Sequence, residues 1–491
     1  MDGGSDAIVI SRAPRALALS FFNGIGLKFG TVGIGIALAR LLGPHEFGTY
    51  AVALLWLTAA LSFNDLGVSL AIVRWPEEPA AIAPTVNTVS LLASAVVAAA
   101  GAALAPTFAL AMGQPAAVGI TRLMCVAVLI SGAVSTPAEL MLRQFMQGKR
   151  LVVDQVNVWV GAVSSLLLAL SGMGALSLAV GRILGSSAAM VLFLRFSPQP
   201  FRLGLDRRYL RPLLHFGVPL AGASIIVFAA SFADQLVVGG VLGASALGYY
   251  VLAFNLSSWP RDAFSLPLRN IAPPTFARLQ HEPEAMRSAF RAVLGLLAAV
   301  TLPICLLLAG AAEPLIRFIY GQAWAPAASA LVWLAMFAAF RITFELAYDY
   351  LVVVGVSRSI LGLQVVTLAA LVPALIEGAR HWGIAGVAAA QVVVAAVVVA
   401  PIYGVLFRRA GLPASRLLGR VWLPLLIGCG VGASAFALGE LLRASALGAC
   451  AAAGTIALLA LAALIYRDRS ELSKLRGSAL ARAAAPREVP V

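Results

Sequence analysis

The sequence predicts an all-α polytopic membrane protein with about 14 transmembrane helices, arranged as two six-helix bundles in a parallel repeat plus two C-terminal helices. Three observations lead to this prediction. Of the 491 residues, 61% are hydrophobic and only 11% are charged, basic residues gather between apolar runs, and one motif recurs 200 positions later. Ordinary soluble domains carry about 25% charged residues. The composition therefore excludes a soluble enzyme, a nucleic-acid-binding module and a secreted disulfide scaffold.

Fourteen apolar runs can cross a bilayer as helices, since a span needs about 20 residues. They cover residues 16–39, 47–73, 87–111, 118–142, 152–171, 174–194, 213–238, 246–268, 292–310, 325–351, 359–376, 383–407, 421–439 and 445–466. The first run is too long for the core of a signal peptide, so we expect it to be retained. The predicted domains are residues 1–200, 201–410, 411–466 and a cytoplasmic tail, 467–491.

The basic residues predict which side of the membrane each loop faces. An even number of spans places both termini on one side, and 27 of the 35 Lys and Arg residues, Arg261 among them, fall there. The opposite loops hold only Arg40, Arg317, Arg380 and Arg443. Because basic loops stay in the cytoplasm, we expect a multi-pass protein of the inner (plasma) membrane with both termini cytoplasmic.

A short motif near residue 42 recurs near residue 242. Four residues of the first copy have identical counterparts 200 positions later. The first copy contains Leu42, Gly43, Gly48 and Tyr50, and the second contains Leu242, Gly243, Gly248 and Tyr250. Six spans separate the copies, so both halves enter the membrane in the same orientation and form a parallel repeat. Two such bundles facing a central cavity suit alternating access, and the last two spans lie outside the repeat.

Besides Arg261, which is counted with the cytoplasmic side, four cations fall within the predicted spans: Lys28, Arg122, Arg182 and Arg341. A charge exposed to lipid at the bilayer centre costs at least ~2.5 kcal/mol, so these residues should face a cavity or a partner. A cavity lined by cations suits an anionic substrate, and we therefore assign these four to substrate binding. For Arg122 and Arg182, which lie near span ends, snorkelling to the headgroups explains the pattern equally well.

Three intramembrane carboxylates, Asp234, Glu345 and Asp349, are candidates for ion coupling. Arg341, Glu345 and Asp349 follow one another at four-residue intervals and so share one helix face. A structural pair between the arginine and one carboxylate is the alternative. The four cysteines and four histidines show no metal-ligand spacing. With no phosphate-binding loop or nucleophile motif either, the sequence predicts no enzyme activity, no metal and no cofactor.

The motif residues resemble a known family. Arg40-Leu41-Leu42-Gly43-Pro44, Phe47-Gly48-Thr49-Tyr50 and Asn64-Asp65-Leu66-Gly67 look like the opening of Wzx-type polysaccharide and O-antigen flippases. These belong to the multidrug/oligosaccharidyl-lipid/polysaccharide exporter superfamily. Asp234-Gln235-Leu236, followed by Leu242-Gly243, resembles the pattern of the second half. The similarity covers about residues 10–410.

The resemblance implies transport of undecaprenyl-diphosphate-linked oligosaccharide units to the outer leaflet for surface, lipopolysaccharide or exopolysaccharide biosynthesis. It also implies contact with membrane lipids and no binding of nucleic acid. A polysaccharide polymerase and chain-length proteins are candidate protein partners under this resemblance. A peptidoglycan lipid flippase and a drug/cation antiporter of the same superfamily are the alternatives. An integral-membrane polymerase or ligase would normally need a large outer loop, and every predicted outer loop is short.

The predicted topology can be tested by cysteine labelling. Single cysteines introduced within residues 1–12, 200–210 and 470–491 should react with a membrane-impermeant reagent only after the cells are opened, because all three segments are expected in the cytoplasm. Labelling of the C-terminus from outside intact cells would contradict the predicted number of spans.

Overall fold

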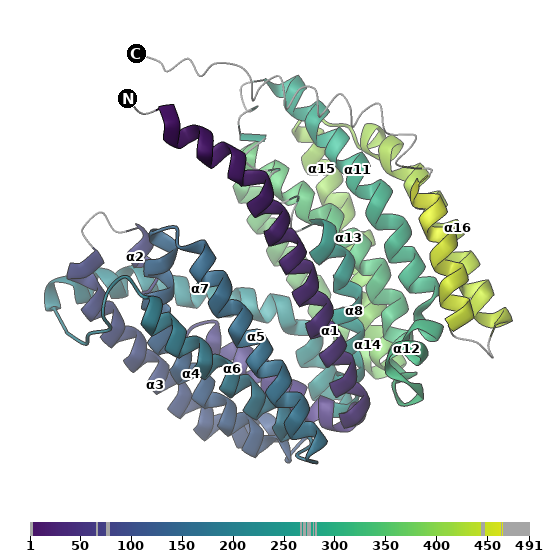
Figure 1. The fold of residues 1–491 in the computed structure, drawn as a ribbon. Helices are drawn as coiled ribbons and strands as arrows, with labels where there is room; N and C mark the ends of the chain where they lie inside the picture. Colours follow the sequence, from purple (N-terminus) through teal and green to yellow (C-terminus); the bar gives the residue numbers. More distant parts are fainter. Residues whose placement is uncertain are drawn as a thin grey trace. The chain divides into compact units, whose positions relative to one another are not determined.

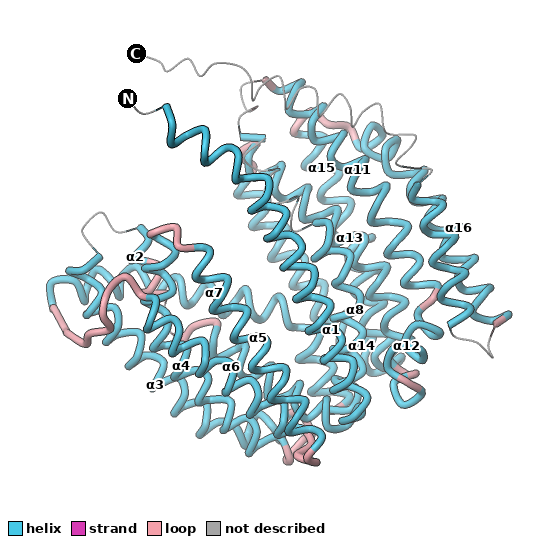
Figure 2. Tube along the Cα trace, in the orientation of Figure 1, coloured by secondary structure: helices cyan, strands magenta, loops and turns pink. Residues whose placement is uncertain are grey.

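Every regular element that the computed structural model describes is a helix (Figure 2). The structure describes the backbone of residues 3–64, 67–74, 79–265, 268, 272, 276–277, 279, 282–442, 447–462 and 464. Side chains are described over the same ranges except 3–31, 74, 357–361 and 414–416. Helices satisfy all backbone hydrogen bonds within one segment, which a bilayer requires. The predicted all-α polytopic fold is confirmed.

The chain divides into two compact units, and the first comprises residues 1–248. Its helices run in an up-and-down order, and α7 packs on α1, α2 and α3. The bounds are α1 (Gly3–Leu61), α2 (Ala71–Arg74), α3 (Pro79–Ala111), α4 (Ala117–Arg143), α5 (Gln147–Leu170), α6 (Ala175–Phe196) and α7 (Arg207–Leu242) (Figure 1).

The second unit comprises residues 249–491, and α8 (Ala244–Pro260) leads into it. Its remaining elements are η1 (Arg261–Ser265), α11 (Pro283–Gly310), α12 (Ala312–Tyr320), η2 (Gln322–Trp324), α13 (Ala327–Val353), α14 (Ser357–Val394), η3 (Ala395–Val399), α15 (Ala400–Arg409), α16 (Ala414–Leu441) and a last apolar helix, Leu447–Ala462. The predicted domain limits at 200, 410 and 466 stay predictions.

Two of the helices join neighbouring predicted spans without a loop. Helix α1 covers the first and second spans and is kinked at Gly43 (φ 69°, ψ 174°), and α14 passes from the eleventh span into the twelfth through Gly383 (φ 60°, ψ −143°). Only glycine adopts such angles without strain. Within the described residues, nine helices are long and apolar enough to cross a membrane.

Close packing between the helices depends on small residues, as is usual in membranes. In the first unit, Gly132 of α4 lies against Ser94 of α3, so that a side chain added at Gly132 would collide with the serine. In the second unit, α16 lies against α11 through Gly432, where an added Cβ would come within 2.8 Å of the Leu306 carbonyl oxygen. Helix α16 is therefore held tightly to the second unit although it lies outside the predicted repeat.

This contact predicts a difference between two glycines of α16. Gly432→Ala should lower the thermal unfolding temperature of the detergent-solubilised protein, because overpacking costs about 1–3 kcal/mol. Gly430→Ala is the matched control, since a Cβ there meets nothing within 4 Å. Both changes bring the same gain in helix propensity, so equal unfolding temperatures for the two variants would argue against the close α11–α16 contact.

Candidate functional site

A cavity of about 460 Å³ lies in the second unit between α13, the two halves of α14, η3 and α15. Aromatic, amide and hydroxyl side chains line it together with one guanidinium and one carboxylate. The lining residues are Phe337, Arg341, Phe344, Glu345, Tyr348, Leu363, Gln364, Thr367, Leu371, Gln391, Val394, Ala395, Val399 and Tyr403. The cavity thus contains two of the residues that the sequence singled out, Arg341 and Glu345.

Glu345 is the centre of a charged cluster at this cavity. Its Oε1 atom lies 2.6 Å from Nε of Arg261 and 3.5 Å from Nε of Arg341. Its Oε2 atom accepts a hydrogen bond of 3.0 Å from the Ser265 hydroxyl. The Glu345 side chain is only 15% exposed, and such a carboxylate is costly to bury unless cations and donors surround it. The cluster therefore stabilises the fold as well as furnishing a polar wall.

Two kinds of helix bring these groups together. Arg341 and Glu345 are one turn apart on α13, as their spacing predicted. Arg261 and Ser265 are the two ends of the π-helix η1, which directly follows α8. Such π-helical turns are rare and often occur at functional sites. The Arg341 guanidinium also lies 5.8 Å from the centroid of the Phe254 ring, a cation–π contact that orients it.

The second copy of the repeated motif reaches the same cavity. Tyr250 is fully buried, and its hydroxyl accepts a hydrogen bond of 2.8 Å from Nε2 of Gln391, a lining residue. In the first unit, Tyr50 lies within electrostatic range of Arg182. Gln391 and Arg182 belong to the twelfth and sixth predicted spans, so each repeat tyrosine interacts with the last predicted span of its predicted half.

The sequence alone does not identify three of these residues as parts of the site: Arg261, Ser265 and Gln391. In the sequence, Arg261 counts only as a basic residue of the cytoplasmic side, and the structure pairs it with Glu345. The interval of four residues between Arg261 and Ser265 inside an apolar run was the available signal. Gln391 lies 141 positions from its partner Tyr250, and nothing local in the sequence indicated that contact.

The other predicted site residues with described side chains lie on α13 and on three helices of the first unit. Asp349 is one turn beyond Glu345 and is buried, with 8% exposure. In the first unit, Asp234 of α7 is 5% exposed, and its Oδ1 accepts a hydrogen bond of 2.8 Å from the Gln235 backbone N–H. Arg122 of α4 is exposed and donates through Nε to the Ala102 carbonyl at 3.3 Å.

Arg182 is exposed on α6. Lys28 belongs to α1, but its side chain lies outside the described residues. The roles assigned to all seven predicted site residues stay predictions.

The two copies of the motif touch each other within the first unit. A Cβ added at Gly48 would collide with the Ala244 carbonyl group, whose carbon it would approach to 2.7 Å. A Cβ added at Gly248 would come within 2.7 Å of the Pro44 carbonyl oxygen. Pro44 and Ala244 are equivalent positions of the repeat, as are the two glycines. The contact is therefore reciprocal, as expected of two elements related by a pseudo-two-fold axis.

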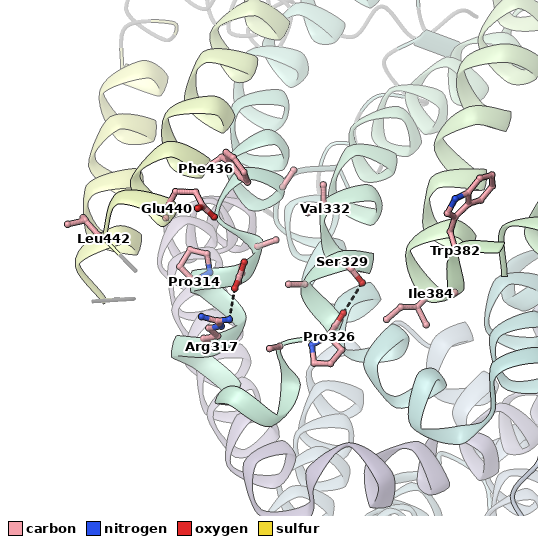
Figure 3. Close-up of a pocket in the computed structure, with 18 residues that line it drawn as sticks. Pro314, Arg317, Pro326, Ser329, Val332, Trp382, Ile384, Phe436, Glu440 and Leu442 are labelled. Atoms are coloured by element: carbon pink, nitrogen blue, oxygen red, sulfur yellow. Dashed lines mark hydrogen bonds and ion pairs between the residues drawn. The ribbon is translucent and has the colours of Figure 1, made fainter. Parts of the chain in front are cut away.

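A larger cavity, of about 810 Å³, lies at the ends of α11, α12, α13 and α16 and beside the kink of α14 (Figure 3). Glu313 and Arg317 form an ion pair of 2.6 Å on its α12 wall. Glu440 lines it from α16, and Trp382 lines it from α14. None of the seven predicted site residues is among the residues that line it.

Comparison with known proteins identifies a family and several relatives. A family model described as "Polysaccharide biosynthesis protein" matches residues 37–329, more than half of the chain. The succinoglycan biosynthesis transport protein ExoT of Rhizobium meliloti (strain 1021) is 28% identical over 338 residues, 67% of this chain and 66% of that protein. The lipopolysaccharide biosynthesis protein WzxC of Escherichia coli (strain K12) is 24% identical over 311 residues, 63% of this chain and 62% of that protein. The chain thus matches slightly less than two thirds of the length of either relative.

Two solved structures share the fold. The lipid II flippase MurJ in an inward closed conformation aligns with a TM-score of 0.73 at 11% identity, covering 91% of this chain and 98% of that chain. A multidrug resistance MATE family transporter in an inward-facing conformation aligns with a TM-score of 0.60 at 14% identity, covering 79% and 95%. Both are polytopic α-helical proteins, in agreement with the predicted fold class.

The charged cluster predicts a ranking of stabilities. Arg261→Leu should lower the thermal unfolding temperature more than Arg341→Leu, because Arg261 is closer to Glu345 and its side chain is less exposed, at 21% against 33%. We expect Arg261→Leu to lower the free energy of unfolding by about 2–3 kcal/mol, somewhat less than the loss on breaking a fully buried ion pair.

Arg380→Gln is the matched control. Its pair with Glu377 has the same 3.5 Å separation as the Arg341 pair but is 64% and 59% exposed, so little stability should be lost. Unfolding temperatures in detergent that fall equally for Arg261→Leu and Arg380→Gln would contradict a structural role for the cluster.

Proposed function

This chain belongs to the polysaccharide biosynthesis protein family, and we propose that it moves undecaprenyl-diphosphate-linked oligosaccharide units from the cytoplasmic to the outer leaflet of the membrane. The observation that carries the proposal is the cavity of the second unit, where the Arg341 guanidinium, two glutamine amides and several aromatic rings converge. The names of the relatives, a succinoglycan transport protein and a lipopolysaccharide biosynthesis protein, support the substrate class.

The lining of this cavity suits a sugar attached to a phosphate. Gln364 and Gln391 can donate and accept hydrogen bonds with hydroxyl groups, and Phe344 and Tyr403 stack on each other with centroids 5.1 Å apart, forming an apolar wall. Arg341 supplies a guanidinium, whose planar fork matches phosphate or carboxylate oxygens. A volume of about 460 Å³ accommodates one or two sugar rings rather than a whole repeat unit. In the first unit we assign the diphosphate contact to Lys28, with Arg122 and Arg182 as further cations.

Transport proceeds by alternating access between the two halves of the repeat. The reciprocal contact of Gly48 with Ala244 and of Gly248 with Pro44 supports this, since small residues let two helix backbones approach each other without interlocking side chains. A membrane potential that is negative inside drives an anionic headgroup outward by ~2.3 kcal/mol per charge per 100 mV. Asp234, Glu345 and Asp349 are the candidate coupling residues, and a cation binding at Glu345 would have to displace an arginine from it.

This function places the protein in the inner membrane with both termini in the cytoplasm. The excess of basic residues on that side supports the orientation. Polysaccharide polymerase and chain-length proteins are the partners that would receive the product. The role is transport without a chemical step, so we propose no enzymatic activity.

The proposal predicts the phenotype of a strain that lacks the gene. Lipid-linked oligosaccharide should accumulate and exported polysaccharide should disappear, and the wild-type gene should restore export. Arg341→Gln should lower export about ten- to a hundredfold, because a charge-assisted hydrogen bond contributes about 1.5–3 kcal/mol, and Lys28→Ala should abolish export. Arg380→Gln, an exposed position outside the cavity, should export normally.

Protein levels in the membrane distinguish a transport defect from misfolding. Normal export by the deletion strain would contradict the proposed function. Full export by Arg341→Gln would instead contradict only the role of this cavity.

A further inference from the structure

The first turns of α7 have two chemically different faces. Leu213 is fully buried against α2, α3 and α4 in a cluster with Ile72, Val86 and other apolar residues. Arg207, Arg211 and His215 are exposed. Because they follow at four-residue intervals, these three residues lie above one another on a single helix face.

This exposed face forms a shallow cavity of about 430 Å³, lined by Arg207, Leu210, Arg211, Leu214 and His215. Leu210 and Leu214 are partly buried and pack against the Leu213 cluster. The cavity therefore combines a stripe of two guanidinium groups and one imidazole with an adjoining apolar stripe. Asp206 directly precedes Arg207 in the sequence. Its carboxylate accepts a hydrogen bond from the Arg208 backbone N–H at 2.9 Å and caps the helix.

The segment before α7 is held by hydrogen bonds to α3, which fixes the position of the helix N-terminus. Side chains at the start of α3 bind the backbone of residues 202–206 through four hydrogen bonds. Asn87 donates to one carbonyl at 2.9 Å, Thr88 donates to another at 2.8 Å and accepts from an N–H at 3.0 Å, and Thr85 accepts from an N–H at 3.1 Å. Leu203 and Leu205 of this segment are 59% and 58% exposed.

We propose that this face of α7 binds the headgroup of an anionic phospholipid. The phosphate lies between Arg207 and Arg211, whose guanidinium groups match its oxygens, and an acyl chain follows Leu210 and Leu214. Helix α7 has 36 residues, about 54 Å at 1.5 Å per residue, against a hydrocarbon core of about 30 Å. The helix is therefore longer than the hydrocarbon core, and the exposed Arg207, Arg208 and Arg211 place its first turns at the level of the headgroups.

The lining argues for a phospholipid over the other phosphate-bearing ligands. Two leucines beside the cations favour a lipid over free phosphate. None of the five lining residues is an amide, phenylalanine, tyrosine or tryptophan, the side chains that the cavity of the second unit offers to a glycan. The site therefore suits a resident lipid of the cytoplasmic leaflet rather than the transported substrate, and it is independent of the proposed function.

Native mass spectrometry of the full-length protein in detergent tests the proposal, with phosphatidylglycerol or phosphatidylcholine added. The wild type should retain phosphatidylglycerol in preference to phosphatidylcholine. Arg207→Gln and Arg211→Gln should each weaken phosphatidylglycerol binding about fivefold, corresponding to ~1 kcal/mol per basic residue near a membrane surface. Arg208→Gln is the matched control, because Arg208 is exposed in the same turn but does not line the cavity.

Three results would overturn the proposal: unchanged phosphatidylglycerol binding by the double variant Arg207→Gln/Arg211→Gln, an equal loss for Arg208→Gln, or equal retention of the two lipids by the wild type. A polyprenyl diphosphate that displaces phosphatidylglycerol from the wild type but not from the double variant would assign the site to the substrate instead. Unfolding temperatures without added lipid identify a misfolded variant. In that case the double variant Arg207→Lys/Arg211→Lys is used instead, which keeps the charges but loses the guanidinium forks. It should bind phosphatidylglycerol with intermediate affinity, and binding with wild-type affinity would contradict the proposed geometry.

Discussion

Water does not enter the hydrocarbon core of a bilayer, and this constraint accounts for the main features of the structure. Backbone groups must be satisfied within each segment, so the described elements are helices. The chain bends sharply at Gly43 and Gly383, where positive φ angles allow one helix to lead directly into the next. Apolar side chains gain little by leaving lipid for a protein interior, so the helices associate through close packing instead. The contacts at Gly132 and Gly432 show this.

The same constraint shapes the charged groups. Glu345 is surrounded by Arg261, Arg341 and Ser265 because a carboxylate with 15% exposure needs compensation. A cluster of this kind serves both the fold and the site: the bonds that stabilise the second unit also orient the Arg341 guanidinium at the cavity. Changes to these residues will therefore affect stability and binding together, and separating the two effects requires both measurements on the same variants.

The internal repeat extends beyond sequence identity to equivalent contacts. Gly48 meets Ala244 just as Gly248 meets Pro44, and each repeat tyrosine interacts with the last predicted span of its predicted half. At other positions the halves differ. Tyr250 is hydrogen-bonded to an amide, whereas Tyr50 lies near the Arg182 guanidinium. Equivalent positions of the repeat thus carry different polar partners.

The sequence by itself determined the fold class, because membrane insertion depends on hydropathy within about 20 consecutive residues. It also indicated the pairing of Arg341 with Glu345, since residues four apart on a helix are neighbours. Only the tertiary structure decided the remaining partners. Arg261 reaches Glu345, 84 positions away, from a π-helical turn, and Tyr250 meets Gln391 across 141 positions. Such contacts depend on how distant helices pack, and hydropathy carries no information about which helix face meets which.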